Sequence, residues 1–160
     1  MSMNLKEDKK AYAIMGCAMR VHRILGDGFL ESAYGDALEV EFARNGIPYV
    51  REDDLRVFYD GVPLKTHYRA DFTCFDRQYI VELKAIKNLT RVEWAQVVHY
   101  MRATRTPYGL LLTCSTSVVR SSSTTHSTKG PSRRYSTTEE VWRKLPPDEN
   151  NAAEGRQESG

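Results

Sequence analysis

The chain has 160 residues, of which 41% are hydrophobic and 28% charged, as in an ordinary globular domain. Its 23 basic and 21 acidic residues leave a net charge of +2, which neither indicates nor excludes a nucleic-acid partner. No apolar run approaches the roughly 18–20 residues of a membrane span, and the charged N-terminus is unlike a signal peptide, so we expect a cytoplasmic protein without a membrane partner. Cys17, Cys74 and Cys114 are far apart and are predicted to be inert, partly buried thiols.

Two helices are predicted first. Apolar residues recur at the helical interval over residues 6–25, and the Gly-Asp-Gly at 26–28 ends that helix. The second helix ends at Asn45-Gly46 and has one apolar face, formed by Leu30, Tyr34, Ala37, Leu38 and Phe42.

The pattern then changes to strands. Residues 55–59 are rich in β-forming side chains and run into the turn signal Asp60-Gly61. Pro63 follows this turn, so the return strand is expected over about 65–75, and a third strand over 78–84. Three strands joined by tight turns predict an antiparallel meander.

A helix and a strand complete the ordered part. Thr90 is a good cap for a helix over about 91–104, and residues 108–113 read as a strand. Because this strand returns through a helix, we expect it to lie parallel to a neighbour.

The composition changes abruptly near Thr113. Fifteen of the twenty-six residues from 113 to 138 are Ser or Thr. Such a segment buries little apolar surface, so we expect a domain over 1–114 and a low-complexity, disordered tail over 115–160, with one short helix at 136–145. A reading-frame change in the gene and a flexible partner-binding tail are two explanations that remain open.

Charged residues interrupt the third strand, which reads YIVELK over 79–84. Strand side chains alternate between faces, so Glu82 and Lys84 share one side, and on the preceding strand Asp71 shares a face with Arg69 and Thr73, opposite Tyr68, Ala70 and Phe72. If the two strands pair, Asp71 and Glu82 meet near one end of the sheet. Two close carboxylates repel unless a cation or proton lies between them, and a divalent ion would satisfy both.

An ordinary surface ion pair between Glu82 and Lys84 is the alternative, since the D-x10-E-x-K spacing is loose. Further residues favour a site. Glu31 begins the second helix, and Gln96 and Tyr100, four residues apart, share a face of the later helix.

Taken together, Gly28, Glu31 and Tyr34, Arg69-Ala70-Asp71, Glu82-Leu83-Lys84 and Gln96…Tyr100 resemble the PD-(D/E)XK nuclease superfamily. Within it, the chain looks like the small bacterial family called GxxExxY proteins. The resemblance covers roughly residues 10–112. It implies an α/β fold with a mixed sheet, a restriction-endonuclease-like αβββαβ core with an extra N-terminal helix.

The resemblance also implies roles for individual residues. Asp71, Glu82 and Lys84 would be catalytic, although Ala70 stands where the signature has proline. Glu31, Asp71 and Glu82 would bind Mg²⁺ or Mn²⁺, and Lys84 would orient the attacking water. Residues expected to contact the substrate are Gln96, Tyr100, Tyr34, Lys87 and Arg91. For Tyr34 a core position, and for Lys87 and Arg91 a solvated loop, are the alternatives.

The function implied is a metal-dependent nuclease that hydrolyses phosphodiester bonds in nucleic acid, with DNA favoured over RNA and a homodimer left open. The alternative is a catalytically inactive module on the same fold that binds nucleic acid or another protein.

Overall fold

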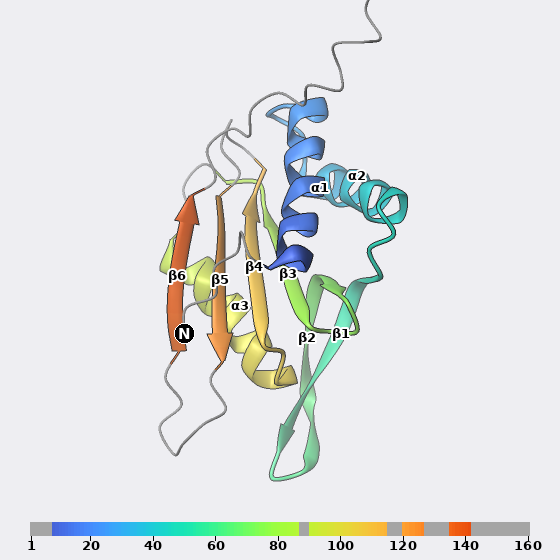
Figure 1. Ribbon diagram of the computed structural model, residues 1–160. Coiled ribbons are helices and arrows are strands. Elements are labelled where there is room, and N and C mark those ends of the chain that lie inside the picture. The colour runs from blue at the N-terminus through green and yellow to red at the C-terminus, as the bar shows by residue number, and fades with distance from the viewer. Residues whose placement is uncertain (1–7, 87–89, 115–119, 127–134, 142–160) are drawn as a thin grey trace, which may run out of the picture.

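The structure is a computed structural model that describes residues 8–86, 90–114, 120–126 and 135–141 (Figure 1). Of 120–126 and 135–141 the structure describes the backbone alone. The elements in chain order are α1 (Lys9–Leu25), α2 (Glu31–Arg44), β1 (Tyr49–Tyr59), β2 (Val62–Cys74), β3 (Tyr79–Lys84), α3 (Arg91–Thr104), β4 (Tyr108–Thr113), β5 (Arg120–His126) and β6 (Tyr135–Val141).

The strands form one mixed sheet in the order β1-β2-β3-β4-β5-β6. All neighbours are antiparallel except β3 and β4, which are parallel and pair from Tyr79↔Tyr108 to Lys84↔Thr113. The predicted order of helix, helix, three strands, helix and strand is confirmed, as is the parallel return through α3. This is the expected α/β fold with a mixed sheet.

Helices α1 and α2 cover one face of the sheet. Asp8 begins α1 by accepting hydrogen bonds from the amides of Lys10 and Ala11, both at 3.0 Å. Tyr34, Leu38 and Phe42 point from α2 into the core and are at most 1% exposed. Burying each such side chain stabilises the fold by roughly 1.5–3 kcal/mol. Their sheet partners are Phe72, Cys74, Tyr79, Val81, Leu83, Leu110 and Leu112.

Helix α3 covers the opposite face, where Val97, Tyr100 and Met101 pack against strands β1 to β4. Thr90 caps this helix, and its side chain and that of Glu93 form a capping box. Gly109 allows the close approach of α3 to β4, because a Cβ atom there would lie 2.5 Å from Val97 Cγ1 and 2.7 Å from Met101 Sδ. The two helical layers therefore hold the sheet between them.

The β1–β2 hairpin is longer than predicted. Strand β1 begins at Tyr49 rather than 55, and β2 begins at Val62 and includes Pro63, so the expected start near residue 65 is wrong. Pro63 pairs with Phe58, whereas the pairs between β2 and β3 lie only at residues 72–74 of β2. A proline without a backbone N–H is tolerated there, because only one edge of the strand is paired.

The strict alternation expected along β2 is also wrong. Phe72 packs on the α1/α2 side, but Ala70 packs on the α3 side. The β1–β2 ladder passes from Arg51↔Phe72 to Asp53↔Ala70, and Glu52, between them on β1, has a φ of +50°. The two strands turn together at this point, so that Asp71 lies at a break in the pleat.

The sheet continues past residue 114, where the domain was expected to end. Strand β5 pairs with β4 from Tyr108↔Thr125 to Leu110↔Ser123, and β6 pairs with β5. The short helix expected at 136–145 is wrong over 135–141, because that segment is a strand whose Thr, Tyr and Val residues favour β structure. The remainder of the expected tail lies outside the described residues.

Two further expectations concern the cysteines and membrane-spanning helices. Cys17, Cys74 and Cys114 are free and buried. Burial raises the pKa of Cys17 to about 11 and those of Cys74 and Cys114 to about 12, which agrees with inert thiols. In the described part of the chain, no helix is long and apolar enough to cross a membrane.

Candidate active site

The candidate site begins where the pairing of β2 and β3 ends. The ladder between these strands runs from Cys74↔Tyr79 to Phe72↔Val81. Beyond it, side chains bind backbone amides instead: Asp71 N donates to Glu82 Oε1 at 3.1 Å, and Leu83 N donates to Asp71 Oδ2 at 2.7 Å. The predicted meeting of Asp71 and Glu82 is therefore present, at a fork between two strands.

Glu82 is the buried centre of this group, with its side chain only 2% exposed. Lys84 Nζ lies 3.7 Å from Glu82 Oε2, and Gln96 Nε2 donates to the same oxygen at 3.3 Å. Gln96 also donates to Tyr100 Oη at 2.8 Å. One carboxylate oxygen is thus shared by a lysine from β3 and an amide from α3, the two elements on which the sequence placed them.

Glu31 reaches the same end of β3 from the first turn of α2. Its Oε2 accepts a hydrogen bond of 3.1 Å from Ala85 N, one residue beyond Lys84. Helix α2 begins at Glu31, so its N-terminal amides favour a negative charge there. Asp71 and Glu31 therefore both bind amides of the short segment 82–85, which contains Glu82.

The acids interact electrostatically. Burial is the main cause that raises the pKa of Glu82, to about 8, and the charge of Asp71 raises it further. Burial likewise raises the pKa of Asp71, with Glu31 adding to the effect, while the hydrogen bond from Leu83 opposes it. A buried carboxyl group beside other acids holds its proton unless a cation is brought in.

The donor chemistry suits a hard divalent cation, which prefers carboxylate oxygens. A carboxylate has about four lone-pair sites, so the hydrogen bonds of Asp71, Glu82 and Glu31 leave capacity for an ion. However, no three His, Cys, Asp or Glu side chains in the described part of the chain already converge as a metal-binding cluster. Bringing all three carboxylates onto one ion would therefore require side-chain movement.

The other residues expected to contact substrate lie differently. Tyr34 is 1% exposed in the core, and its hydroxyl donates to the carbonyl oxygen of Gly26. It therefore occupies the core position that was the alternative to substrate contact. Arg91 is the exposed first residue of α3. Lys87 lies outside the described residues. Of the five residues expected to contact substrate, Gln96 and Tyr100 lie beside Glu82.

Two features of the site were not predicted. The first is the break in the pleat at Glu52, where the sequence has no glycine or proline as a signal. The second is a large groove beside Tyr68, whose ring packs 5.2 Å from that of Tyr100. The groove combines residues from two hairpin strands and a helix end, and no local pattern in the sequence indicated it.

A three-layer α/β fold whose sheet carries an acid, a second acid and a lysine at a strand fork is the architecture of a nuclease-like protein. Comparison with protein families agrees: the model of the PD-(D/E)XK nuclease superfamily matches residues 8–124. The chain belongs to this superfamily. The match extends past residue 114 into β5. Neither a curated protein nor a solved structure matches the chain.

Proposed function

We propose that this protein is a metal-dependent nuclease of the GxxExxY type that hydrolyses phosphodiester bonds in nucleic acid, with DNA favoured over RNA. The observation that carries the proposal is the buried Glu82 carboxyl, which lies against Asp71, Lys84 and Gln96 in a superfamily of nucleases. Burying a carboxyl group away from water costs free energy, and such groups are found where they bind a cation or take part in a reaction.

Asp71 and Glu82, joined by Glu31, would hold Mg²⁺ or Mn²⁺, and nucleases of the superfamily generally use divalent ions. The ion would supply a Lewis acid for the phosphoryl oxygen and lower the pKa of a bound water. Lys84 is 22% exposed at its side chain, so it can reach solvent and orient the attacking water while it remains near Glu82. Gln96 would position the Glu82 carboxylate, and Tyr100 would hold Gln96.

The test is cleavage of single- and double-stranded DNA and RNA with Mg²⁺, Mn²⁺ or EDTA. We expect cutting only with an ion, and none in Asp71→Asn or Lys84→Ala. Asparagine keeps an oxygen that can accept from Leu83 N, so the fold should survive while the charge is removed. Lys65→Ala, an exposed lysine on β2, is the matched control and should cut like the parent. Equal cutting by parent and site variants would overturn the assignment.

The second candidate is a non-catalytic module on the same fold. One observation favours it: within the described residues, Asp71, Glu82 and Glu31 accept hydrogen bonds from backbone amides and do not form a cluster of metal ligands. Titration with Mn²⁺ while the melting temperature is followed separates the two. An ion that binds the native state raises the melting temperature, and Asp71→Asn should lose this rise. The absence of any rise in the parent would favour the module.

A further inference from the structure

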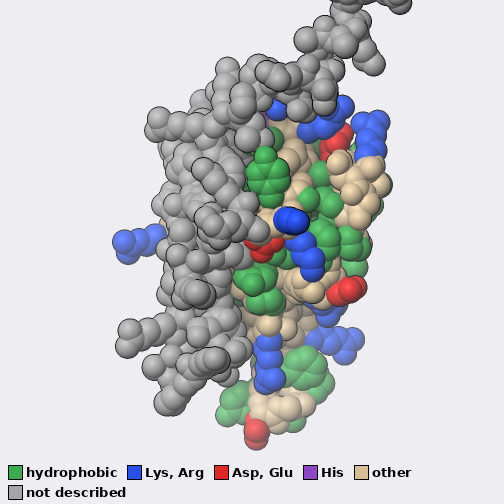
Figure 2. Space-filling view, in the orientation of Figure 1, with side chains coloured by type: hydrophobic (Ala, Val, Ile, Leu, Met, Phe, Trp, Pro, Cys, Tyr) green, Lys and Arg blue, Asp and Glu red, His purple; other side chains and the backbone are tan. Residues whose placement is uncertain are grey.

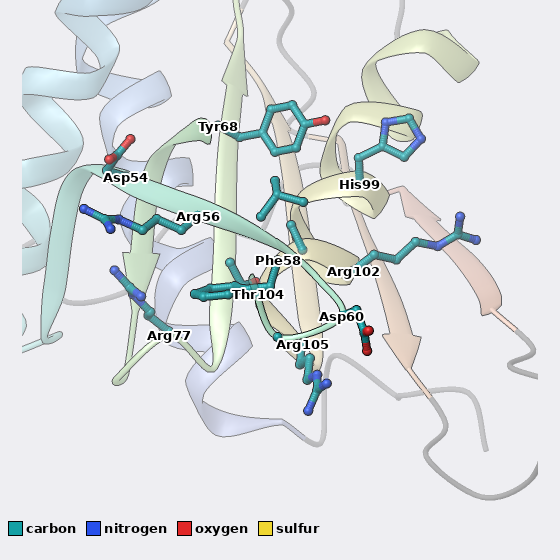
Figure 3. A pocket seen from close by; sticks show the side chains of 13 residues that line it. Asp54, Arg56, Phe58, Asp60, Tyr68, Arg77, His99, Arg102, Thr104 and Arg105 are labelled. Carbon is teal, nitrogen blue, oxygen red and sulfur yellow. The ribbon is translucent and has the colours of Figure 1, made fainter. Parts of the chain in front are cut away.

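A wide groove lies between the β1–β2 hairpin and the C-terminal end of α3. Its volume is about 1070 Å³, slightly above the roughly 300–1,000 Å³ typical of small-molecule pockets. Figure 3 shows Phe58 near its middle, with Arg56 and Arg77 on one side and Arg102 and Arg105 on the other. An open groove of this size suits a segment of a polymer better than a small molecule.

The charges in the groove favour an anionic ligand. Four arginines line it against two aspartates, Asp54 and Asp60. Arg77 is paired through Nε and Nη2 with Asp53, which offsets its charge, although its side chain remains 54% exposed. Arginine presents a planar fork of donors that matches the oxygens of a phosphate group. Phosphodiesters passing along the groove would therefore meet arginine on both sides.

Aromatic side chains lie between the arginines. Phe58, one residue before the end of β1, is 58% exposed, and Tyr68 lines the same groove. Exposed apolar residues also gather at the end of this hairpin, at the bottom of Figure 2, where Tyr59 and Val62 are 74% and 61% exposed. Accessible aromatic faces between phosphate-binding groups are the arrangement by which proteins stack unpaired bases.

The groove is connected to the candidate active site by direct contacts. The ring of Tyr68 packs against that of Tyr100, with centroids 5.2 Å apart. The hydroxyl of Tyr100 accepts from Gln96, which donates to Glu82. A strand lying in the groove would thus lead toward the buried acid along one side of α3.

We propose that this groove binds single-stranded nucleic acid and leads it to the acids. The proposal rests on the proposed function for its claim that the bound strand is the substrate. A duplex keeps its bases stacked inside, so it could use the arginines but not Phe58 or Tyr68. A single strand, or a frayed end, can use both kinds of contact.

The test measures binding of labelled oligothymidine by fluorescence anisotropy in EDTA, so that cleavage cannot occur. Phe58→Ala should weaken binding roughly tenfold, because one base can no longer stack. Arg56→Ala and Arg105→Asn should each reduce the slope of log K against log salt by about 0.7 for every phosphate that the variant no longer neutralises. Asparagine suits Arg105 because this residue has a φ of +57°.

Arg23→Ala is the matched control: Arg23 is an exposed arginine on α1, outside the groove, and its variant should bind like the parent. Unchanged affinity and salt slope in all three groove variants, or equal dependence of duplex binding on Phe58, would overturn the inference. Weaker binding by the groove variants supports the inference about the groove, whether or not the parent protein cuts nucleic acid. If the parent cuts nothing with Mn²⁺, only the proposed function is overturned.

Discussion

The backbone amide of Asp71 donates to the carboxylate of Glu82, at 3.1 Å, where the ladder between their strands has already ended. The next amide of β3, that of Leu83, binds the Asp71 carboxylate in return. Two acids thus substitute for backbone pairing at a fork in the sheet. This arrangement keeps them close to each other and away from water, which determines how they titrate.

The first prediction concerns pH and stability without metal. The pKa of Glu82 is raised from an ordinary value of 4.5 to about 8 in the folded protein. Between these values the unfolded chain has lost a proton that the folded protein retains, so raising the pH favours unfolding. In EDTA, the free energy of unfolding should therefore fall as the pH rises from about 5 to 8, as measured by urea denaturation.

Glu82→Gln provides the control for this slope. Glutamine does not titrate, and its carbonyl oxygen can still accept from Asp71 N. The variant should show a weaker pH dependence over the same range, with the raised pKa of Asp71 accounting for what remains. A parent protein that becomes more stable between pH 5 and 8 in EDTA would contradict the electrostatics described for the site.

The second prediction concerns the contact of α3 with β4. A methyl group at Gly109 would lie 2.5 Å from Val97 and 2.7 Å from Met101, both buried. Gly109→Ala should therefore lower the free energy of unfolding by about 1–3 kcal/mol, through overpacking. Gly16→Ala is the matched control: it lies within α1 with nothing within 4 Å of the added Cβ, and it should stabilise by up to about 1 kcal/mol. The same sign for both changes would argue against this packing.

The third prediction concerns the buried carboxylate of Asp53. Arg77 donates to both of its oxygens, at 2.8 and 2.7 Å, and Thr73 donates to one at 2.8 Å. Arg77→Ala leaves Asp53, which is 6% exposed, with the Thr73 hydroxyl as its remaining donor. This should lower the free energy of unfolding by about 1–3 kcal/mol. Adding Asp53→Asn removes the unpaired charge, so the double variant should be more stable than Arg77→Ala. A less stable double variant would show that the charge is not what destabilises.

The fourth prediction concerns the thiols. Burial raises the pKa of all three cysteines to about 11 or 12, so very little thiolate is present at pH 8. A chromogenic disulfide reagent should react slowly with the native protein and rapidly with three thiols in denaturant. A fast-reacting native cysteine would mean that one thiol is exposed; replacing each of the three by alanine in turn would identify it.

The order of elements was predictable because each depends on a local pattern. The apolar spacing of 6–25 and the capping residue Thr90 indicate helices wherever they lie in space, and both helices are present. The strand at 108–113 has the predicted bounds for the same reason. Tyr49–Asp54 was missed because residues 51–54 are four charged residues in a row, which gives the edge strand β1 no apolar alternation there.

The candidate site was predictable in part. Glu82 and Lys84 share a side of one strand, and Gln96 and Tyr100 share a face of one helix, so their proximity follows from local geometry. The role of Tyr34 did not follow, because the spacing of a helix face does not say whether that face meets a core or a cleft. In the structure this face is the core.

The sequence by itself determined the helices, the strands and which charged residues share an element, since backbone periodicity acts over a few residues. Only the tertiary structure decided that β2 and β3 part at Asp71, that Glu31 reaches Ala85, and that arginines from a hairpin and a helix end face one groove. Those relationships join residues far apart in the chain. They depend on how the layers pack and on where one residue, Glu52, adopts a left-handed backbone, and neither is encoded in a local pattern.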